Sequence, residues 1–208
     1  MDDTILIVDD SQYIVDGLIA LLKRKGFKTL AATGGEQALS LLASSTPDLI
    51  LLDIMMEPMD GWETLDRIKA NPQMKDIPVL MFSAKKISPT EAEEHSMKIE
   101  DFISKPVNPA QLLESIHQIF SRRSNVIAEA SIAKEAGFES GLIDEYTRLR
   151  KSIEVDRNML TVLKNSSGMN APGYVADPDT VSAIQKLEEK IRADKARLNE
   201  ISAKFPKK

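Results

Sequence analysis

The chain has 208 residues, of which 42% are hydrophobic and 28% are charged, and its formal net charge is −5. These values are typical of a globular protein with one substantial core and a smaller module. The chain contains no cysteine, which excludes disulfides, thiolate metal sites and cysteine nucleophiles. No apolar run approaches the roughly 18 residues of a membrane span, and acidic residues stand where a signal peptide would be basic. We therefore expect a cytoplasmic protein with no membrane partner.

The charge is distributed unevenly along the chain. Residues 1–123 contain 13 Lys+Arg and 19 Asp+Glu, a net charge of −6, whereas residues 124–208 contain 14 and 13, a net charge of +1. Neither part is strongly basic, as a protein that binds nucleic acid by neutralising phosphates would be. The balance disfavours DNA binding, although a local basic patch would be enough to support it.

The first 120 residues alternate short apolar runs with amphipathic stretches. Apolar runs predict strands at residues 5–8, 29–32, 49–52, 79–82 and 101–103. Helical spacing predicts helices before Gly26, over residues 36–43, before Asn71 and from Pro109 onward. Repeated β/α units of this kind form an α/β fold, a doubly wound parallel sheet of five strands with right-handed crossovers.

Polar side chains follow four of the five predicted strands. They are Asp9 and Asp10, Asp53, Ser83 and Lys105. In a doubly wound sheet the functional site lies beyond the carboxyl ends of the strands. The sequence therefore predicts that these groups meet at one edge of the sheet.

The residue types at this edge indicate phosphoryl transfer. Three carboxylates repel one another unless a cation lies among them, and oxygen ligands without His or Cys favour Mg²⁺. A lysine and a serine hydroxyl suit contacts to phosphoryl oxygens, and an aspartate can act as the nucleophile. Each residue alone is common in surface loops, so the prediction rests on their combination.

Residues 1–122 resemble the receiver domain of two-component response regulators (CheY-like). The motifs that carry this resemblance are Val8-Asp9-Asp10, Leu52-Asp53, Met59-Asp60-Gly61, Phe82-Ser83-Ala84 and Lys105-Pro106. The resemblance implies a flavodoxin-like sheet with strand order 2-1-3-4-5. It also implies that a sensor histidine kinase phosphorylates Asp53.

The resemblance further implies a role for each residue at the edge. Asp9, Asp10, Asp53 and the backbone carbonyl of Met55 would bind Mg²⁺. Lys105 would pair with the phosphoryl group, and Ser83 and Phe102 would form the switch pair.

The loop after Asp53 departs from the family pattern. Glu57 stands where the family usually has proline, and proline follows one place later. We expect Glu57 to be a solvated carboxylate. Met55 and Lys85 are expected to shield the phosphoryl group from water and so to influence dephosphorylation.

The C-terminal part is predicted to be helical. Residues 123–141 are expected to extend the last receiver helix as a linker, and residues 142–208 to form an antiparallel helical hairpin. Apolar residues alternate at spacings of four and three in two segments, each interrupted by an aspartate. The first segment comprises Leu142, Tyr146, Leu149, Ile153, Asp156, Leu160 and Leu163, and the second comprises Ile184, Leu187, Ile191, Asp194, Leu198, Ile201 and Phe205.

Pairing Leu163 with Ile184 would place Asp156 near Ile191 and Asp194 near Ile153, so that the two carboxylates are offset. Residues 165–179 contain Gly and Pro and are expected to form the connecting loop. Val155, Met159 and Val162 form a second apolar stripe, which we expect to pack on another chain or on the receiver.

The hairpin loosely resembles the HalX-type output segment of archaeal response regulators, through Leu142-Ile143-Asp144-Glu145-Tyr146, Leu149 and the stretch from Leu187 to Leu198. An alternative is a helix-turn-helix spanning residues 132–143, which would make the chain a DNA-binding transcription regulator. The acidic Glu139, Asp144 and Glu145 would face phosphates in that arrangement, so DNA binding is disfavoured.

The leading hypothesis is a response regulator that signals through a helical dimerisation or protein-interaction module. Its chemistry is confined to its own phosphorylation and dephosphorylation, so it is not expected to be an enzyme acting on an external substrate.

Overall fold

The computed structural model describes residues 3–85, 87–166 and 178–204. The chain divides into two compact units. The first unit contains Met1–Lys86 and Lys98–Leu112, and the second, here called the helical unit, contains Ile87–Met97 and Leu113–Lys208. Within the described ranges, no helix combines the length and apolar character that a membrane crossing requires.

The first unit is built on a parallel sheet of five strands in the order β2-β1-β3-β4-β5. The strands are β1 (Thr4–Val8), β2 (Lys28–Ala32), β3 (Leu49–Asp53), β4 (Val79–Ser83) and β5 (Asp101–Ser104). The central strands β3 and β4 are buried along their whole length, as their continuous apolar runs predict. The predicted fold class and strand order are confirmed.

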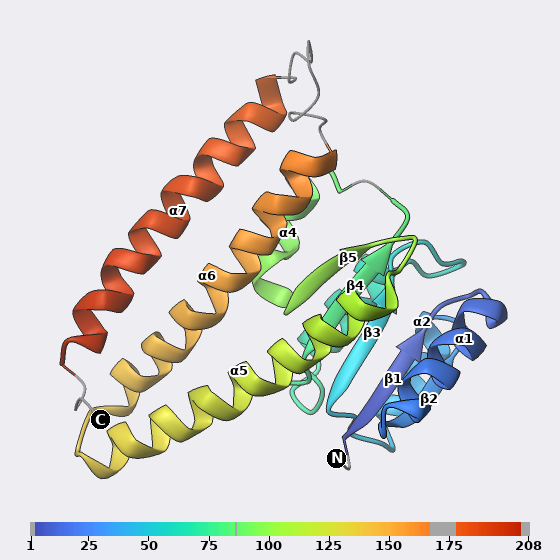
Figure 1. Ribbon diagram of the computed structural model, residues 1–208, viewed down its shortest axis with the longest axis horizontal. Helices are drawn as coiled ribbons and strands as arrows, with labels where there is room; N and C mark the ends of the chain where they lie inside the picture. The colour runs from blue at the N-terminus through green and yellow to red at the C-terminus, as the bar shows by residue number, and fades with distance from the viewer. Residues whose placement is uncertain (1–2, 86, 167–177, 205–208) are drawn as a thin grey trace. The chain divides into compact units, whose positions relative to one another are not determined.

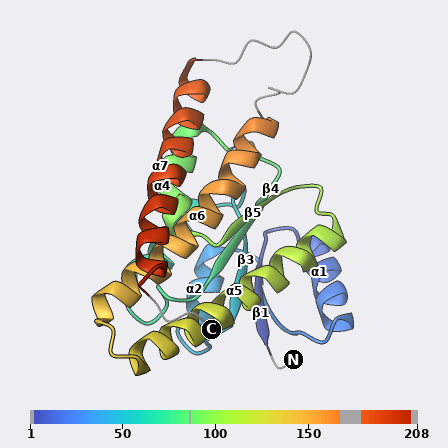
Figure 2. The ribbon, with the colours of Figure 1, turned by 60° about the vertical axis from the view of Figure 1, so that its left-hand side comes forward.

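Helices lie on both faces of this sheet. They are α1 (Gln12–Arg24), α2 (Gly35–Leu42) and α3 (Gly61–Ala70). Right-handed crossovers in this strand order put α1 on one face and α2 and α3 together on the other. Figure 2 shows α1 and α2 on opposite sides of the strands. The chain leaves α1 through Gly26, whose φ of 90° is the left-handed conformation that glycine adopts readily.

The helical unit contains α4 (Pro89–His95), most of α5 (Pro109–Glu135), α6 (Ser140–Ser166) and α7 (Pro178–Ser202). Helix α5 continues well beyond Arg122 and ends before Gly137, whose φ is 82°. Helix α4 contacts α7, although it lies between β4 and β5 in the sequence. The apolar pattern of the sequence did not delimit α4, because this helix is short and its residues are mostly polar.

Helices α6 and α7 form an antiparallel hairpin and lie side by side in both ribbon views (Figures 1 and 2). Near one end, Tyr146, Leu149 and Ile201 form a buried cluster with Leu142 and Leu198 packed against it. At the other end, Lys164 Nζ lies 2.7 Å from Glu188 Oε1. The predicted antiparallel hairpin is therefore confirmed. Phe205 and most of the connecting segment 165–179 lie outside the described residues.

A polar cluster interrupts the apolar seam of the hairpin. Ser152 Oγ donates to one carboxylate and lies within hydrogen-bonding distance of both, 3.1 Å from Asp156 Oδ2 and 2.9 Å from Asp194 Oδ2. Lys190 Nζ donates to Asp156 Oδ2 at 2.6 Å. The two carboxylates are offset as expected, but Ser152 bridges them and Lys190 compensates their charge. The heptad pattern did not identify these two partners.

The second apolar stripe of α6 is largely covered. Val162 is half-buried, and Val155 and Met159 are each 1% exposed within the single chain. Burial of these side chains therefore does not require a second copy of the protein, which was one of the two expectations for this stripe.

Candidate functional site

The polar groups that follow the strands meet at one edge of the sheet. Val8 pairs with Leu52 and Asp53 pairs with Phe82, so Asp9 lies beside Asp53 at the ends of β1 and β3. Ser83 pairs with Ser104 at the ends of β4 and β5, and Lys105 follows directly. The register of the parallel strands therefore places the residues expected at this edge together.

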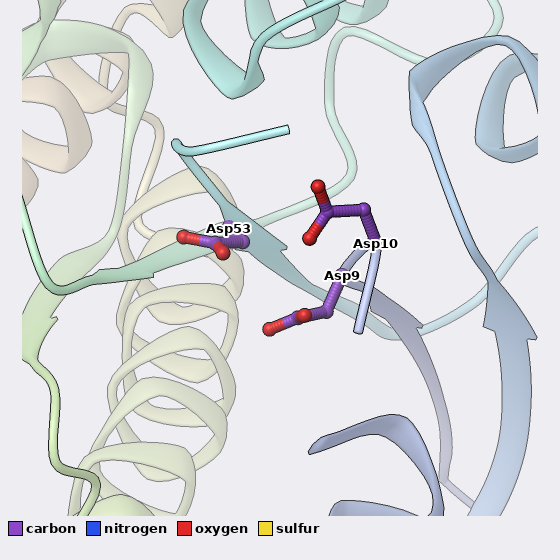
Figure 3. A group of neighbouring side chains, drawn as sticks. All are labelled: Asp9, Asp10 and Asp53. Atoms are coloured by element: carbon purple, nitrogen blue, oxygen red, sulfur yellow. The ribbon is translucent and has the colours of Figure 1, made fainter. Parts of the chain in front are cut away.

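Three carboxylates form the centre of the site. Oxygen atoms of Asp9, Asp10 and Asp53 all lie within 4.8 Å of one another. Figure 3 shows them gathered at the ends of β1 and β3, with Asp10 directly after Asp9. Asp9 and Asp53 are buried, whereas Asp10 is exposed. The backbone N–H of Ser11 donates to Asp9 Oδ1 at 2.9 Å, and the N–H of Met55 donates to Asp53 Oδ1 at 3.2 Å.

Lys105 is the cation of this cluster. Its Nζ donates to Asp9 Oδ2 at 2.7 Å and to Asp53 Oδ2 at 2.6 Å. The ammonium also lies 4.7 Å from the centre of the Phe82 ring, a distance at which the ring attracts a cation. Three carboxylates and one ammonium leave a formal charge of −2 when all four groups are ionised. A divalent cation would neutralise that charge, and the donor atoms are oxygens, as Mg²⁺ prefers.

Burial raises the pKa of the Asp9 carboxyl above its ordinary value of 3.8, because desolvation disfavours the charged form. Hydrogen bonds from Lys105 and Ser11 act in the opposite direction and are the smaller effects. The folded state thus binds a proton at Asp9 more readily than the unfolded state does. This difference in proton binding stabilises the folded state at pH values below the unfolded pKa of Asp9. The stabilisation is lost as the pH rises through the folded pKa of Asp9.

We expect Asp9→Asn to make the protein more stable than the wild type at pH 7 in buffer without divalent cations. The amide carries no charge to desolvate, and its oxygen still accepts from Lys105. Thermal unfolding followed by circular dichroism should show a higher midpoint, by about 2–4 °C for each kcal/mol gained in a chain of this size. The difference should shrink as the pH is lowered, because protonation of Asp9 removes the charge that burial disfavours.

Asp10→Asn is the matched control, because the exposed Asp10 carboxyl is solvated in both states and should change the midpoint less. A lower midpoint for Asp9→Asn at pH 7 would show that attraction to Lys105 outweighs desolvation.

The other expected residues occupy different environments. Ser83 is fully buried, and its Oγ accepts from the backbone N–H of Lys85 at 3.2 Å. Phe102 is buried on β5 beside Met81. Met55 is 55% exposed, and Lys85 and Glu57 are exposed as well. Met56 and Met59, in the same loop, are buried.

Gly61 has a structural role that the sequence motif did not reveal. A Cβ at this position would overlap the carbonyl oxygen of Asp53 and would lie 2.7 Å from the Cα of Ile54. The Gly61 N–H donates to the Ile54 carbonyl at 2.9 Å, which closes the loop over the end of β3. The neighbouring Asp60 begins α3, because its side chain accepts from the Glu63 N–H at 2.8 Å. The absence of a side chain at residue 61 therefore lets this loop pack against Asp53.

We expect Gly61→Ala to destabilise the fold by about 1–3 kcal/mol, because the methyl group meets backbone atoms that cannot move independently. Urea unfolding would measure the change in free energy. Gly17→Ala is the matched control: Gly17 lies inside α1 with nothing within 4 Å of its Cβ position, and alanine there should stabilise by about 0.5–1 kcal/mol. Equal behaviour of the two variants would contradict the proposed role of Gly61.

Comparison with known families agrees with this geometry. The model of the response regulator receiver domain matches residues 5–117, more than half of the chain. The chain belongs to the response regulator receiver family. A second model, Metanogen output domain 2, matches residues 122–208. This match covers the predicted helical hairpin, the segment that loosely resembles the HalX-type output segment.

Individual relatives and solved structures are also similar to this chain. The alkaline phosphatase synthesis transcriptional regulatory protein PhoP of Bacillus subtilis is 32% identical, over 69% of this chain and 58% of its own length. The structure of the chemotaxis protein CheY4 of Vibrio cholerae has 28% identity and a TM-score of 0.53, covering 57% of this chain and 98% of CheY4. A CheY-like receiver domain protein of Methanospirillum hungatei has 29% identity and a TM-score of 0.52, covering 58% and 98%.

The chain spans less than two thirds of the length of the first of these curated relatives. The receiver at residues 5–117 is the part of this chain for which the family is shown. The transcriptional roles in the names of some relatives belong to those relatives.

Proposed function

We propose that this response regulator accepts a phosphoryl group on Asp53 from a sensor histidine kinase in the cytoplasm and transmits the change to its helical output domain. The observation that supports this proposal best is the contact of Lys105 with both Asp9 and Asp53 inside a cluster of three carboxylates. A nucleophilic carboxylate, a cation and excess negative charge at one edge of the sheet suit phosphoryl transfer.

In the transfer step, a carboxylate oxygen of Asp53 forms a bond to phosphorus. The bond between phosphorus and the imidazole nitrogen of the kinase histidine breaks, and the nitrogen keeps the electron pair. Asp53 is 3% exposed, and hydrogen bonds from Met55 and Lys105 hold its two oxygens in different directions. A fixed carboxylate loses little entropy on reaching the reactive geometry.

Asp9, Asp10, Asp53 and the carbonyl of Met55 would bind Mg²⁺, which when bound supplies positive charge opposite the phosphoryl oxygens. The three carboxylates suit a hard divalent cation, because they supply oxygen ligands and a formal charge of −2 after Lys105 is counted. Lys105 would follow the phosphoryl group as an ion-pair partner. Its contact to Asp53 shows that the ammonium reaches the acceptor carboxylate.

Ser83 and Phe102 form the proposed switch pair. Ser83 would turn its hydroxyl toward the phosphoryl group, and the Phe102 ring would adjust its packing. Phosphorylation then favours one of two pre-existing arrangements, which is a shift in population. The backbone of β4 continues from Ser83 toward α4, and α4 contacts α7 within the helical unit, so the chain itself joins the switch residue to the output helices.

The proposed domain organisation is a receiver at residues 1–122, a linker at residues 123–141 that extends α5, and an output module at residues 142–208. The output module would act through a protein partner or a second copy of the chain. The catalysis of this protein is limited to its own phosphorylation and dephosphorylation.

A DNA-binding output is the second candidate, and its one support is that several relatives are transcriptional regulators by name. Tyr146 and Leu149, which follow the residues of the helix-turn-helix alternative on α6, are buried in the core of the α6–α7 hairpin. The hairpin therefore uses that part of α6 for its own packing.

Phosphoryl uptake tests the proposal directly. The protein is incubated with acetyl phosphate in the presence of Mg²⁺ or of EDTA, and intact mass is measured by mass spectrometry. We expect one phosphoryl group per chain with Mg²⁺ and none with EDTA. A mobility-shift assay on the two samples with DNA from the upstream region of its own gene separates a DNA-binding output from a protein-binding one.

A further inference from the structure

The helical unit contains a cleft that the phosphorylation site does not use. It lies among α5, α6 and α7 and has a volume of about 810 Å³. Cavities of about 300–1,000 Å³ are typical of small-molecule sites. All of its lining residues belong to the helical unit, so the cleft is a feature of that unit alone.

The lining of this cleft is strongly basic. Arg122 comes from α5, Arg150 and Arg157 from α6, and Lys195 from α7, whereas Glu154 is the one carboxylate among the described lining residues. Four cations and one anion give a local charge of +3 without His117. Residues 113–208, which include every lining residue, contain 16 Lys+Arg and 14 Asp+Glu, a net charge of +2, so positive charge is concentrated at this place.

Two of these cations have no anionic partner in the described part of the chain. Arg122 Nη1 is buried and makes no hydrogen bond there, which is costly for a charged group. Lys195, on a different wall of the cleft, forms no ion pair with another described residue. An anion that contacts both side chains would compensate them together.

The remaining two arginines keep donors available. Arg150 contacts Glu129 at 3.2 Å and the Tyr146 hydroxyl at 3.0 Å, and both contacts use Nη1. Arg157 contacts Glu154 at 2.8 Å, also through Nη1. A guanidinium has five N–H donors, so each arginine retains several for a ligand.

The other lining groups define the class of ligand. The side-chain amides of Gln118, Asn125 and Asn199 add neutral donors, and Ile153 and Leu198 add an apolar surface. Multiple donors around cations suit the many acceptor oxygens of phosphate groups, which arginine binds bidentately. The apolar residues suit a ring attached to the phosphate.

We propose that this cleft binds a small organic phosphate of the nucleotide class, with Arg122 and Lys195 contacting its phosphate groups. Such a ligand would connect α5 to α6 and α7 and would stabilise their arrangement by mass action. The output domain would then respond to a metabolite as well as to phosphorylation of Asp53.

Isothermal titration calorimetry on the full chain tests this site. ATP, pyrophosphate and citrate are titrated separately in low-salt buffer with EDTA, which keeps Mg²⁺ from the receiver. We expect one saturable site for ATP, weaker binding of pyrophosphate and no comparable binding of citrate. Arg122→Gln and Lys195→Gln should each weaken ATP binding about tenfold or more, as the loss of a hydrogen bond to a charged group does.

Arg192→Gln is the matched control, because Arg192 is exposed on α7, does not line the cleft and carries the same charge. We expect it to change binding by less than about twofold, and Asp53→Asn to bind ATP as the wild type does. Arg122→Lys keeps the positive charge but loses the bidentate guanidinium. Its affinity for ATP should lie between those of the wild type and Arg122→Gln.

Near-UV circular dichroism is used to check that each variant is folded. If the Arg122 variants unfold, the ATP affinity of Lys195→Gln tests the proposal by itself. The proposal is overturned by the absence of saturable ATP binding at millimolar concentration. An equal loss in Arg192→Gln, equal affinity for citrate, or loss of binding in Asp53→Asn would overturn it too.

Discussion

Asp53→Asn is expected to abolish phosphoryl uptake from acetyl phosphate in the presence of Mg²⁺. The amide is nearly the same size as the carboxylate, so the fold should be retained. The amide oxygen carries no negative charge and is therefore a poor nucleophile toward phosphorus. Intact-mass spectrometry should find the added phosphoryl group in the wild type and not in the variant. Partner capture with the two phosphorylation states would then show whether the output depends on Asp53.

Asp66→Asn is the control for this experiment. Asp66 belongs to α3, lies outside the carboxylate cluster and contacts Lys98 at 2.7 Å on the surface. The Asp66→Asn substitution removes the same charge from the same unit as Asp53→Asn does. It should leave phosphoryl uptake unchanged. Equal uptake by the wild type and Asp53→Asn would refute the assignment of the acceptor.

Lys105→Ala is expected to destabilise the protein by roughly 3 kcal/mol in buffer without divalent cations. The substitution leaves two buried carboxylates without their shared cation. Removing one partner of a buried ion pair is strongly destabilising, because the other charge stays buried without compensation. Lys105 is 17% exposed at its side chain, so solvent replaces little of the lost contact. Urea unfolding of wild type and variant would measure the difference.

Mg²⁺ should restore more stability to Lys105→Ala than to the wild type. Removal of the ammonium changes the formal charge of the cluster from −2 to −3, and a cation that binds the folded state stabilises it more when it binds more tightly. The difference in stability between the two proteins should therefore narrow as the Mg²⁺ concentration rises.

Lys98→Ala is the matched control, because Lys98 also contacts one aspartate at 2.7 Å but is 37% exposed. An exposed ion pair contributes about 0–1 kcal/mol, so this variant should be close to the wild type and insensitive to Mg²⁺. A loss in Lys105→Ala no larger than in Lys98→Ala would contradict the central position of Lys105.

The elements of the receiver could be predicted well because their signals are local. Residues 49–52 and 79–82 are continuous apolar runs, and both became strands buried along their length. Helix α4 had no such signal, since its seven residues are mostly polar and it contacts α7, which begins more than 80 residues later. Its position depends on tertiary contacts that a local pattern does not contain.

The hairpin shows the same division. Heptad spacing identified the antiparallel pair and the positions of Asp156 and Asp194, because both follow from the period of an α-helix. The pattern did not show that Ser152 contacts both carboxylates or that Lys190 compensates Asp156. Polar partners across two helices depend on axial register and side-chain conformation, which only the folded pair defines.

At Asp53, the order of residues along the chain is enough to predict which groups reach the edge of the sheet, because parallel strands end on the same side and each carries a known residue at its end. How these groups interact follows from the folded arrangement. Lys105 contacts Asp53 across 52 residues of sequence and Asp9 across 96, and Gly61 allows the loop to pack on the backbone of Asp53. These contacts depend on strand register and on available space, and neither is encoded in the residues of any single segment.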